Sequence, residues 1–276
     1  MSLADKLFIE NCRLIIDNGF DQTGEKVRPH WEDGTPAYTK KYFGIVNRYD
    51  LSQEFPILTI RPINFRAAID EILWIWQKKS NNINDLNSKI WNQWAREDST
   101  IGKAYGYQMQ LKHKYKEGMF DQVDRVLFDL KNNPSSRRIL TSMYNFADLH
   151  DMALYPCAYS MTFNVTGNKL NAILNQRSQD MLVANNWNVI QYSVLIHMFA
   201  QVSGLVAGEF IHVISDAHIY DRHIPIVEEL LKQEIYAPPV FKVNQSIDNF
   251  YDFTVDDFKL ENYEHGPAVT KIPVAI

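Results

Sequence analysis

The chain has 276 residues, of which 46% are hydrophobic and 22% charged, a composition typical of one globular domain with a sizeable core. The formal net charge of −5 argues against a protein built mainly to coat nucleic acid, so no nucleic-acid partner is expected. The two cysteines, Cys12 and Cys157, are too few for a disulfide framework and predict a reducing, cytoplasmic compartment. No segment has the apolar length of a membrane span, and the histidines lack zinc-binding spacing, so neither a membrane nor a metal is expected.

The first half of the chain predicts two helices separated by extended segments. Residues 3–18 have an amphipathic helical pattern, and residues 28–51 are polar at first and then strand-like. The segment FPILTIRPI, residues 55–63, has the composition of a short apolar strand. Residues 64–77 predict a strong helix, because their apolar side chains recur at intervals of three and four.

The two acidic residues of that second helix lie on opposite sides of its apolar stripe. Asp70 shares its side with Arg66 and Gln77, whereas Glu71 shares its side with Trp74 and Ile75. We therefore expect Glu71 to have the drier surroundings, which raise the pKa of a carboxyl group.

The second half predicts strands and helices that do not alternate regularly, which favours an α+β fold in a single domain over residues 1–276. A long apolar helix is expected to form the buried centre and to end near Gly204. The expected elements are a helix over 120–132, a strand over 135–144, a hairpin over 155–181, the central helix over 188–205, a strand and turn over 208–223, and a last helix over 224–233.

The predicted hairpin brings a cysteine close to an arginine. If Gly167 and Asn168 form a two-residue turn, Cys157 lies opposite Ser178 and next to Arg177. A β-bulge would shift this pairing by one residue. Arg177 is then expected to lower the pKa of the thiol and favour a reactive thiolate. The alternative is a buried structural cysteine, which is common for this residue type.

Further arginines point to an anionic ligand. Arg137 and Arg138 are adjacent in a strand-like segment, so they are expected to point to opposite faces, and Arg28 is another candidate. Several arginines and one cysteine suggest a phosphorylated substrate attacked by a thiolate. Ion pairs with acidic residues are the simpler alternative for each arginine alone.

A series of segments from Arg28 to Ile276 resembles the thymidylate synthase family, in the family's order. They are DEILWIWQ, IWNQW, AYGYQ, NPSSRR, LYPCAYSMTF, NQRSQDM, WNVIQYSVLIHMFAQVSG, SDAHIYDRH, FYDFTVDDFKL and PVAI. The resemblance implies a single α+β domain with a large, mostly antiparallel or mixed sheet packed on a buried central helix. It also implies a homodimer formed through the sheet, with Arg137 and Arg138 donated to the neighbour's phosphate site.

The resemblance further implies reductive methylation of dUMP to dTMP, with 5,10-methylenetetrahydrofolate as donor of both the one-carbon unit and a hydride. Cys157 matches the nucleophile that adds to C6 of the uracil, because C5 stays inert until ring conjugation is broken. Glu71 matches the general acid/base, and Tyr105 the tyrosine associated with removal of the C5 proton. The implied catalytic set is Cys157, Glu71, Tyr105, Arg177, Asp180 and Asn188.

The same resemblance assigns the ligand contacts. The residues implied to bind dUMP are Arg28, Arg137, Arg138, Gln176, Arg177, Ser178, Asp180, Asn188, His218 and Tyr220. The residues implied to bind folate are Arg61, Ile90, Trp91, Trp94, Leu154, Asp180, Ala184, Trp187 and Ala275. The tail that ends at Ile276 is implied to close over the cofactor, and no metal is implied.

Some positions depart from the family's usual pattern. Ala158 stands where His is common, Ala184 where Gly is common and Trp187 where Phe is common, which leaves folate affinity open. Arg61 replaces a common Lys and keeps a positive charge for a polyglutamate tail. Asn188 favours uracil over cytosine, because an amide both donates to O4 and accepts from N3–H.

Three other functions remain open at this level. A deoxyuridylate hydroxymethylase of the same family would add water where the synthase adds hydride. A thiol hydrolase using Cys157 with His218 would work without folate. A non-catalytic binding protein on the same fold would have no need for a nucleophile beside an acid/base.

Overall fold

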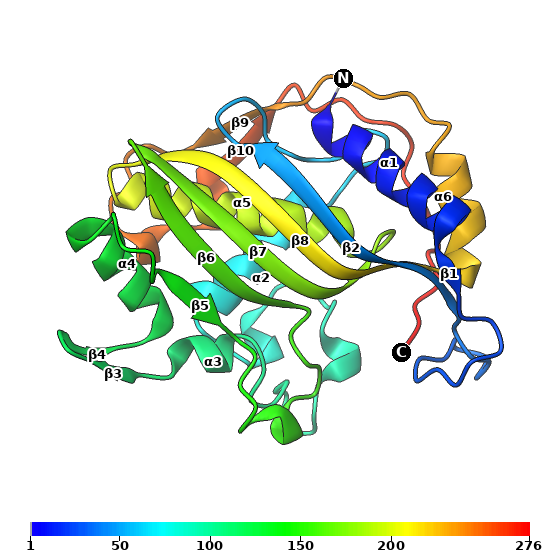
Figure 1. Ribbon diagram of the computed structural model, residues 1–276, viewed down its shortest axis with the longest axis horizontal. Coiled ribbons are helices and arrows are strands. Elements are labelled where there is room, and N and C mark those ends of the chain that lie inside the picture. The colour runs from blue at the N-terminus through cyan, green and yellow to red at the C-terminus, as the bar shows by residue number, and fades with distance from the viewer. Residues whose placement is uncertain (1) are drawn as a thin grey trace.

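A computed structural model describes residues 2–276 and contains a six-stranded sheet with helices packed against it (Figure 1). The α-helices in this part of the chain are α1 (Leu3–Asn18), α2 (Phe65–Trp76), α3 (Gly106–Gln110), α4 (Gln122–Asn132), α5 (Asn185–Val202) and α6 (Ile224–Leu230). The strands are β1 (Phe20–Asp21), β2 (Thr39–Asp50), β3 (His113–Tyr115), β4 (Gly118–Phe120), β5 (Leu140–Ser142), β6 (Ala158–Thr166), β7 (Lys169–Asp180), β8 (Val206–Tyr220), β9 (Val240–Val243) and β10 (Phe258–Glu261).

The large sheet has the strand order β1-β2-β8-β7-β6-β5. Its neighbouring strands are antiparallel except β7 and β8, which run parallel. The α5 helix connects β7 to β8, as a parallel pair requires a crossover. The β3–β4 and β9–β10 pairs form two small separate sheets. This mixed sheet confirms the predicted α+β class.

The central helix α5 is buried nearly all round, as its apolar sequence predicts. It contacts β7, β8 and α2, so α5 packs on one face of the sheet and α2 packs in turn on α5 (Figure 1). Gly204 follows the helix with φ +69°, the left-handed conformation that glycine adopts freely at a helix end. The prediction of a buried centre over 188–205 is therefore confirmed, with the helix beginning at Asn185.

The hairpin has the predicted turn but a different register at its base. Val165 pairs with Leu170, as a Gly167-Asn168 turn requires. An irregularity between Ala158 and Ser160 then shifts the pairing by one, so that Arg177 N donates to Cys157 O at 2.9 Å. Cys157 therefore lies opposite Arg177 instead of Ser178, because the bulge inserts one residue into β6.

The prediction of a strand over residues 55–63 is wrong. This buried segment is irregular, and its two prolines lack the N–H that a strand ladder needs. Side chains take over the bonding: Asp5 accepts from the N–H groups of Thr59 and Ile60, and Asn186 Oδ1 from that of Leu58. The segment is thereby fixed beneath the start of α5 without joining a sheet.

Arg137 and Arg138 do not lie in a strand, which corrects the expectation for residues 135–144. The strand β5 covers only Leu140–Ser142, and the two arginines precede it in an exposed, irregular segment. The rule of opposite faces for neighbouring strand residues therefore does not apply to them.

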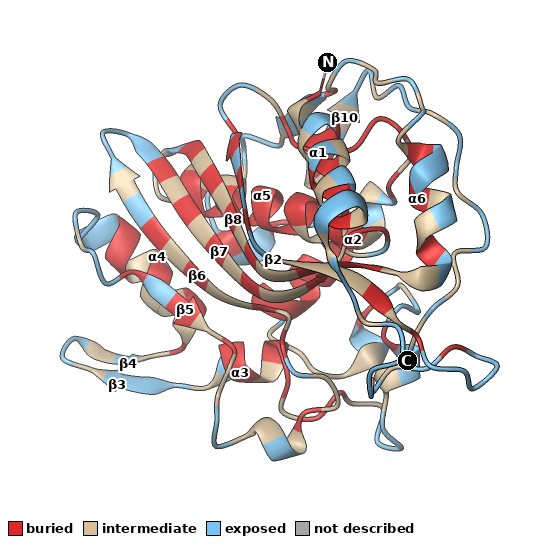
Figure 2. Ribbon diagram, turned by 45° about the vertical axis from the view of Figure 1, so that its right-hand side comes forward, coloured by how far each residue is buried: buried red, intermediate tan, exposed pale blue. Residues whose placement is uncertain are grey.

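The face of the sheet opposite α5 carries apolar side chains that no other element within residues 2–276 covers. Buried and half-buried residues alternate along β7 and β8, as Figure 2 shows. Ile173 pairs with Ile211 across these strands, and both are half-buried between fully buried neighbours. On β2, Val46 is 56% exposed, and Phe43 is 84% exposed. An aliphatic sheet face of this kind is typical of a protein–protein interface.

Candidate active site

The candidate nucleophile Cys157 lies directly before β6 and is held beside a guanidinium group. Arg177, on β7, approaches the thiol with Nη2 at 3.7 Å from Sγ. The same guanidinium donates to Tyr155 O at 2.6 Å and to Pro156 O at 3.0 Å. These carbonyl bonds fix the arginine and the cysteine to one another, which confirms that the hairpin brings the two together.

Burial raises the pKa of the Cys157 thiol, and the opposing effect of Arg177 is smaller. A hydrogen bond involving Tyr105 and the charge of Arg28 also lower the pKa, but the net direction is upward. Arg177 therefore lowers the pKa of the thiol, as predicted, but burial outweighs its effect and the net shift does not favour the thiolate. The reason is the cost of removing the thiolate from water at this half-buried position.

Tyr105 contacts Cys157 from the N-terminus of α3. The Cys157 N–H donates to Tyr105 Oη at 3.1 Å, so the phenol lies at the base of the nucleophile. Tyr105 has φ +47° and ψ −107°, a conformation that side chains rarely adopt. Strained backbone is often found at functional sites, where surrounding contacts hold it in place.

Glu71 is clamped by two indole groups. Its Oε1 accepts from Trp91 Nε1 at 2.8 Å and its Oε2 from Trp187 Nε1 at 2.5 Å. Burial raises the pKa of Glu71 to about 7, although the bonds from Trp187 and Trp91, and the nearby Gln191 amide, lower it. Glu71 thus has the predicted dry environment, although Asp70 is buried to nearly the same extent, and the carboxyl group of Glu71 can exchange a proton near neutral pH. The other acid, Asp70, is also buried but accepts hydrogen bonds from Asn87.

Replacing Trp187 by Phe is expected to raise the pKa of Glu71 by about one unit. The variant keeps an aromatic ring but loses one N–H that favours the charged carboxylate, and a hydrogen bond to a charged group is worth about 1.5–3 kcal/mol. The pKa can be measured by titrating the carboxyl carbon of Glu71 with isotope-edited NMR.

Trp94→Phe is the matched control for this prediction. Trp94 packs against Trp91 with ring centroids 5.4 Å apart, but it donates no hydrogen bond to Glu71. A shift of equal size in both variants would show that aromatic packing, and not the indole N–H, sets this pKa.

Asn188 lies in the first turn of α5 within a cluster of amide side chains. Its Oδ1 accepts from Gln176 Nε2 at 3.0 Å, and its Nδ2 donates to Gln191 Oε1 at 3.0 Å. Gln176 Nε2 also donates to the carbonyl of Ser178, on the same strand. The structure therefore brings Gln176 and Asn188 together, as expected for two residues implied to contact the base, and Ser178 joins them through its main-chain carbonyl.

Asp180 is a charged group at the end of β7. Its Oδ1 accepts from the N–H groups of Leu182 and Val183, and its Oδ2 lies 3.7 Å from His223 Nδ1. Burial acts to raise the pKa of Asp180, but its contacts with His223 and these N–H groups outweigh it, so the net direction is down. A carboxylate of this kind is suited to accept N–H groups from a ligand.

The C-terminal tail reaches the loop that carries Arg28. Ile276 and His30 exchange two main-chain hydrogen bonds of 2.9 and 3.0 Å. His223 Nε2 donates to Pro273 O at 2.8 Å, which ties the tail to the partner of Asp180. Ala275 is half-buried between these attachments.

His218 and Tyr220 follow one another on the same side of β8. His218 Nδ1 lies 2.9 Å from Asp216 Oδ1, and the imidazole is buried. Tyr220 packs edge-on against His218 and Trp31, with centroid distances of 5.3 and 5.6 Å. The Asp216 carboxylate fixes the ring of His218, which leaves the other ring nitrogen for a ligand.

Three of the arginines implied to bind phosphate have no acidic partner in the described part of the chain. Arg28, Arg137 and Arg138 are exposed, and none forms a salt bridge within residues 2–276. The alternative that acidic residues of the same chain pair with these arginines is therefore not supported by the described contacts. Arg28 lies near enough to Cys157 and Tyr220 to favour their ionised forms.

The predicted folate residues divide into two groups. Trp91 is buried, and the half-buried or more exposed members are Ile90, Trp94, Leu154, Ala184, Trp187 and Ala275. Arg61 differs from expectation, because its Nη2 donates to Leu182 O and its guanidinium is largely enclosed. It supports the turn after β7 instead of standing free for a polyglutamate tail.

Comparison with known proteins gives the family. A sequence model described as thymidylate synthase matches residues 6–276. A thymidylate synthase from Bacillus licheniformis is 46% identical over 275 residues, covering 98% of each chain, and thymidylate synthase 1 from Bacillus subtilis strain 168 is 45% identical over 271 residues, covering 96% of this chain and 97% of that protein. The solved structure of thermostable thymidylate synthase A from B. subtilis matches with a TM-score of 0.94 and 44% identity, covering 99% of both chains.

The chain belongs to the thymidylate synthase family. Members of this family are methyltransferases that use methylenetetrahydrofolate as co-substrate. The predicted family, fold class and enzyme class are therefore confirmed. In this thymidylate synthase family member, Ala158 is buried beside the nucleophile and supplies no imidazole there.

Sequence reasoning missed several polar residues around the site. Gln191 lies three residues after Asn188 on α5, and this spacing alone places the two side chains on one helix face. His212 and His223 lie on or just after β8 and contact Gln176 and Asp180. No short-range pattern marks these two histidines, because their partners come from β7.

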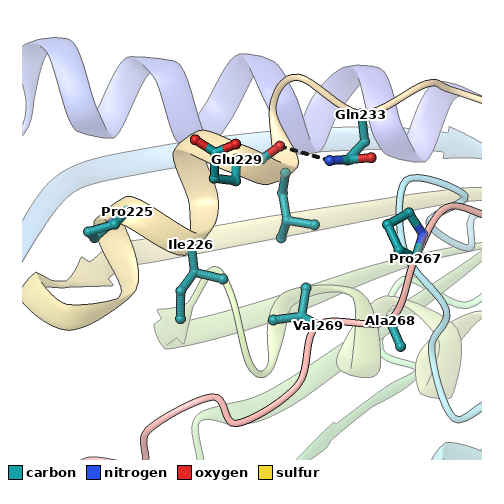
Figure 3. A pocket seen from close by; sticks show the side chains of 8 residues that line it. Pro225, Ile226, Glu229, Gln233, Pro267, Ala268 and Val269 are labelled. Atoms are coloured by element: carbon teal, nitrogen blue, oxygen red, sulfur yellow. Dashed lines mark hydrogen bonds between the residues drawn. The ribbon is translucent and has the colours of Figure 1, made fainter.

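One groove in the described part of the chain lies apart from the candidate active site. A groove of about 350 Å³ lies between α6 and the tail, lined by Pro225, Ile226, Glu229, Leu230, Gln233, Pro267, Ala268 and Val269 (Figure 3). None of these residues belongs to the candidate site. Residues 2–276 contain no group of three or more His, Cys, Asp or Glu side chains that is able to hold a metal ion. No helix in the same range is long and apolar enough to cross a membrane.

Proposed function

We propose that this protein makes dTMP from dUMP by reductive methylation, with 5,10-methylenetetrahydrofolate as the one-carbon and hydride donor. The observation that carries the proposal is the meeting of Cys157 with Arg177, 3.7 Å apart, in a chain 46% identical to a thymidylate synthase. A nucleophile next to a fixed cation suits attack on a phosphorylated, electron-poor ring.

In the proposed reaction, the thiol of Cys157 loses its proton and adds to C6 of the uracil. C5 then carries the electron pair and attacks the methylene carbon of the folate, forming a carbon–carbon bond. Loss of the C5 proton and of the folate amine leaves an exocyclic methylene group. A hydride from the folate reduces this group as Cys157 departs, which yields dTMP and dihydrofolate.

Glu71 and Tyr105 are proposed to move protons in this sequence. The pKa of Glu71, about 7, suits a group that both gives and accepts a proton near neutral pH. Tyr105, whose Oη lies 3.1 Å from Cys157 N, is proposed to assist removal of the C5 proton. Because burial raises the pKa of Cys157 and Arg177 lowers it, Arg177 is proposed to stabilise the thiolate that forms as Cys157 adds to C6.

The remaining nucleotide contacts follow from the arrangement of polar groups. Arg28, Arg177 and Ser178 are proposed to bind the phosphate of dUMP. His218 and Tyr220 are proposed to bond the deoxyribose hydroxyl. Asn188 is proposed to read O4 and N3–H of uracil, with Gln176 beside it.

The folate is proposed to bind against the indole groups near Glu71. Trp91, Trp94 and Trp187 offer flat apolar surface, and Asp180 offers a charged acceptor for the pterin ring. Ile90, Leu154, Ala184 and Ala275 would complete the pocket. The tail, tied to the loop of Arg28 through His30, is proposed to close over the bound folate and exclude water.

A homodimer is proposed through the uncovered face of the sheet. The aliphatic pair Ile173 and Ile211, together with exposed Phe43 and Val46, supports this interface. Arg137 and Arg138 have no acidic partner within residues 2–276 and are proposed to reach the phosphate site of the second subunit.

Mixing two inactive variants tests this exchange of arginines. An Arg137→Ala, Arg138→Ala double variant and a Cys157→Ala variant are expected to recover roughly a quarter of wild-type activity after joint refolding. Random reassortment makes half of the dimers hybrids, and each hybrid has one intact site. No recovery, with hybrids shown to form, would mean that the arginines serve their own subunit.

The proposed reaction is tested by incubating the protein with dUMP and methylenetetrahydrofolate and separating the products. Equal amounts of dTMP and dihydrofolate are expected, with no conversion of dCMP. Hydroxymethyl-dUMP would instead indicate the hydroxymethylase reaction, and product formation without folate would indicate a thiol hydrolase. No product with any nucleotide would favour a binding protein.

A further inference from the structure

The amide cluster around Asn188 is anchored by a histidine that the proposed reaction does not use. His212 lies on β8, is fully buried, and its Nε2 is 2.7 Å from Gln176 Oε1. Gln176 in turn contacts Asn188, the residue proposed to read the base. Four residues from β7, β8 and α5 thus form one continuous chain that runs from His212 through Gln176 and Asn188 to Gln191.

A contact with a main-chain carbonyl reveals the direction of the hydrogen bonds in this series of side chains. Gln176 Nε2 lies 3.1 Å from Ser178 O, and a carbonyl oxygen only accepts. The amide end that faces Ser178 must therefore be the NH₂ group, and the end that faces His212 must be the oxygen. His212 must then donate from Nε2.

The surroundings of His212 agree with that direction. Burial lowers the pKa of His212 to about 3, so the imidazole is neutral and carries a single N–H. Its Nδ1 has no hydrogen-bond partner within residues 2–276. A bare ring nitrogen tolerates this better than an N–H would, because a buried donor without a partner is costly. The single hydrogen therefore belongs on Nε2.

The orientation of Asn188 follows from the orientation of Gln176. Since Gln176 presents its NH₂ group, Asn188 must present Oδ1 to it, at 3.0 Å. Gln179 adds a longer contact of 3.4 Å to the same oxygen, and its own NH₂ end is directed by the carbonyl of Asp180. Asn188 Nδ2 then faces Gln191 Oε1, which leaves the Gln191 NH₂ group without a partner and on the side of Glu71.

We propose that His212 is a positioning residue for base selection, which fixes the Asn188 amide through Gln176 and so favours uracil over cytosine. An amide held with its oxygen and NH₂ group in set places matches the N3–H and O4 of uracil. The reverse orientation would match N3 and the 4-amino group of cytosine. This inference rests on the proposed function, because it assumes that Asn188 contacts the base.

The first test is His212→Leu, assayed with dUMP and dCMP by the ratio of their kcat/KM values. The variant removes the donor to Gln176 and leaves a buried amide oxygen unpaired, which frees the cluster to reorient. We expect the ratio of kcat/KM for dUMP to kcat/KM for dCMP to fall at least 10-fold. An unchanged ratio in a folded variant would overturn the proposal. If the wild-type protein makes no dTMP, the proposed function itself fails, so the two failures are distinct.

His197→Leu is the matched control. His197 is a second neutral histidine, half-buried on α5, and it packs against Phe55 and Phe241 without a hydrogen bond to the amide cluster. Its replacement is expected to lower thermal stability but to leave the ratio between the two nucleotides unchanged. An equal fall of the ratio in both variants would assign the effect to general loosening of the core.

A second variant reverses the direction of the hydrogen bond between residue 176 and Asn188 without removing His212. In Gln176→Glu, the carboxylate still accepts from His212 but can only accept from Asn188, so Nδ2 must turn toward it. We expect kcat/KM for dUMP to fall and kcat/KM for dCMP to rise relative to that value. The ratio between the two nucleotides should therefore change more than it does in His212→Leu. A proportional loss with both nucleotides would contradict the proposed directionality.

A measurement on the wild-type protein remains decisive if these variants do not fold. The ¹⁵N chemical shifts of the histidine ring nitrogens at pH 7 report which nitrogen carries the hydrogen. We expect His212 to be neutral with its hydrogen on Nε2. A hydrogen on Nδ1 would reverse the orientations deduced for the amides of Gln176, Asn188 and Gln191, and it would overturn the proposal.

Discussion

Cys157→Ser is expected to reduce the formation of dTMP by at least about 10⁴-fold, the range seen when a catalytic nucleophile is removed. A serine hydroxyl ionises far less readily than a thiol, and the pocket already raises the pKa of the group at this position by burial. The KM for dUMP should change little, because the phosphate contacts remain. Initial rates with saturating folate measure this effect.

Cys12→Ala is the control for this prediction. Cys12 is the other cysteine, is fully buried in α1, and has a pKa raised by burial, so it is an unreactive core residue. The variant should retain activity per folded molecule while losing some stability. If Cys157→Ser kept more than a tenth of wild-type turnover, nucleophilic attack by this thiol would be excluded.

Glu71→Gln is expected to reduce turnover by about 10²- to 10⁴-fold, the range typical of removing a general acid/base. The amide keeps the size of the side chain and can still accept from one indole, but it cannot exchange a proton at neutral pH. A measurement of kcat at several pH values should show the loss of a transition near pH 7 in the variant. Retention of that transition would assign it to another group.

The same substitution is expected to stabilise the fold above neutral pH. The pKa of Glu71 is about 7 in the folded protein and near its ordinary value of 4.5 in the unfolded chain, so folding favours the protonated form. The stability that this group provides when protonated is present below pH 4.5 and is lost as the pH rises through 7. The total loss is up to about 3 kcal/mol.

Unfolding by denaturant at two pH values checks the sign of this effect. Glu71→Gln should match the wild-type protein near pH 4 and exceed it at pH 8. Equal stabilities of the two proteins at pH 8 would contradict a strongly raised pKa at this position. The combination of lost activity with gained stability is the pattern expected when a site stores an unfavourable charge for use in catalysis.

Local patterns predicted the elements that carry most of the site. The helical stripe around Glu71 was correct because its apolar residues recur at helical spacing, and burial followed from that geometry. The hairpin turn at Gly167 and Asn168 was correct because few sequences fit a two-residue turn. The proposed roles of Cys157 and Asn188 came from the family resemblance, because no periodic pattern in the sequence indicates them.

The errors arose where distant contacts overrode local preference. Residues 55–63 have strand composition, but Asp5 and Asn186 bind their main-chain groups from other elements. The net pKa direction of Cys157 depends on how far the pocket excludes water, which a neighbouring Arg177 does not reveal. The contact between His212 and Gln176 joins two strands through the parallel pair β7–β8, whose register depends on the crossover by α5.

The central claim is that Cys157 forms a bond to the substrate ring, and covalent trapping tests it most directly. The protein is incubated with 5-fluoro-dUMP and methylenetetrahydrofolate, digested, and analysed by mass spectrometry. The account predicts a stoichiometric adduct of nucleotide and folate on the peptide that contains Cys157, absent when folate or Cys157 is missing. A protein that converts dUMP to dTMP yet yields no adduct, or yields one on another residue, would contradict the account.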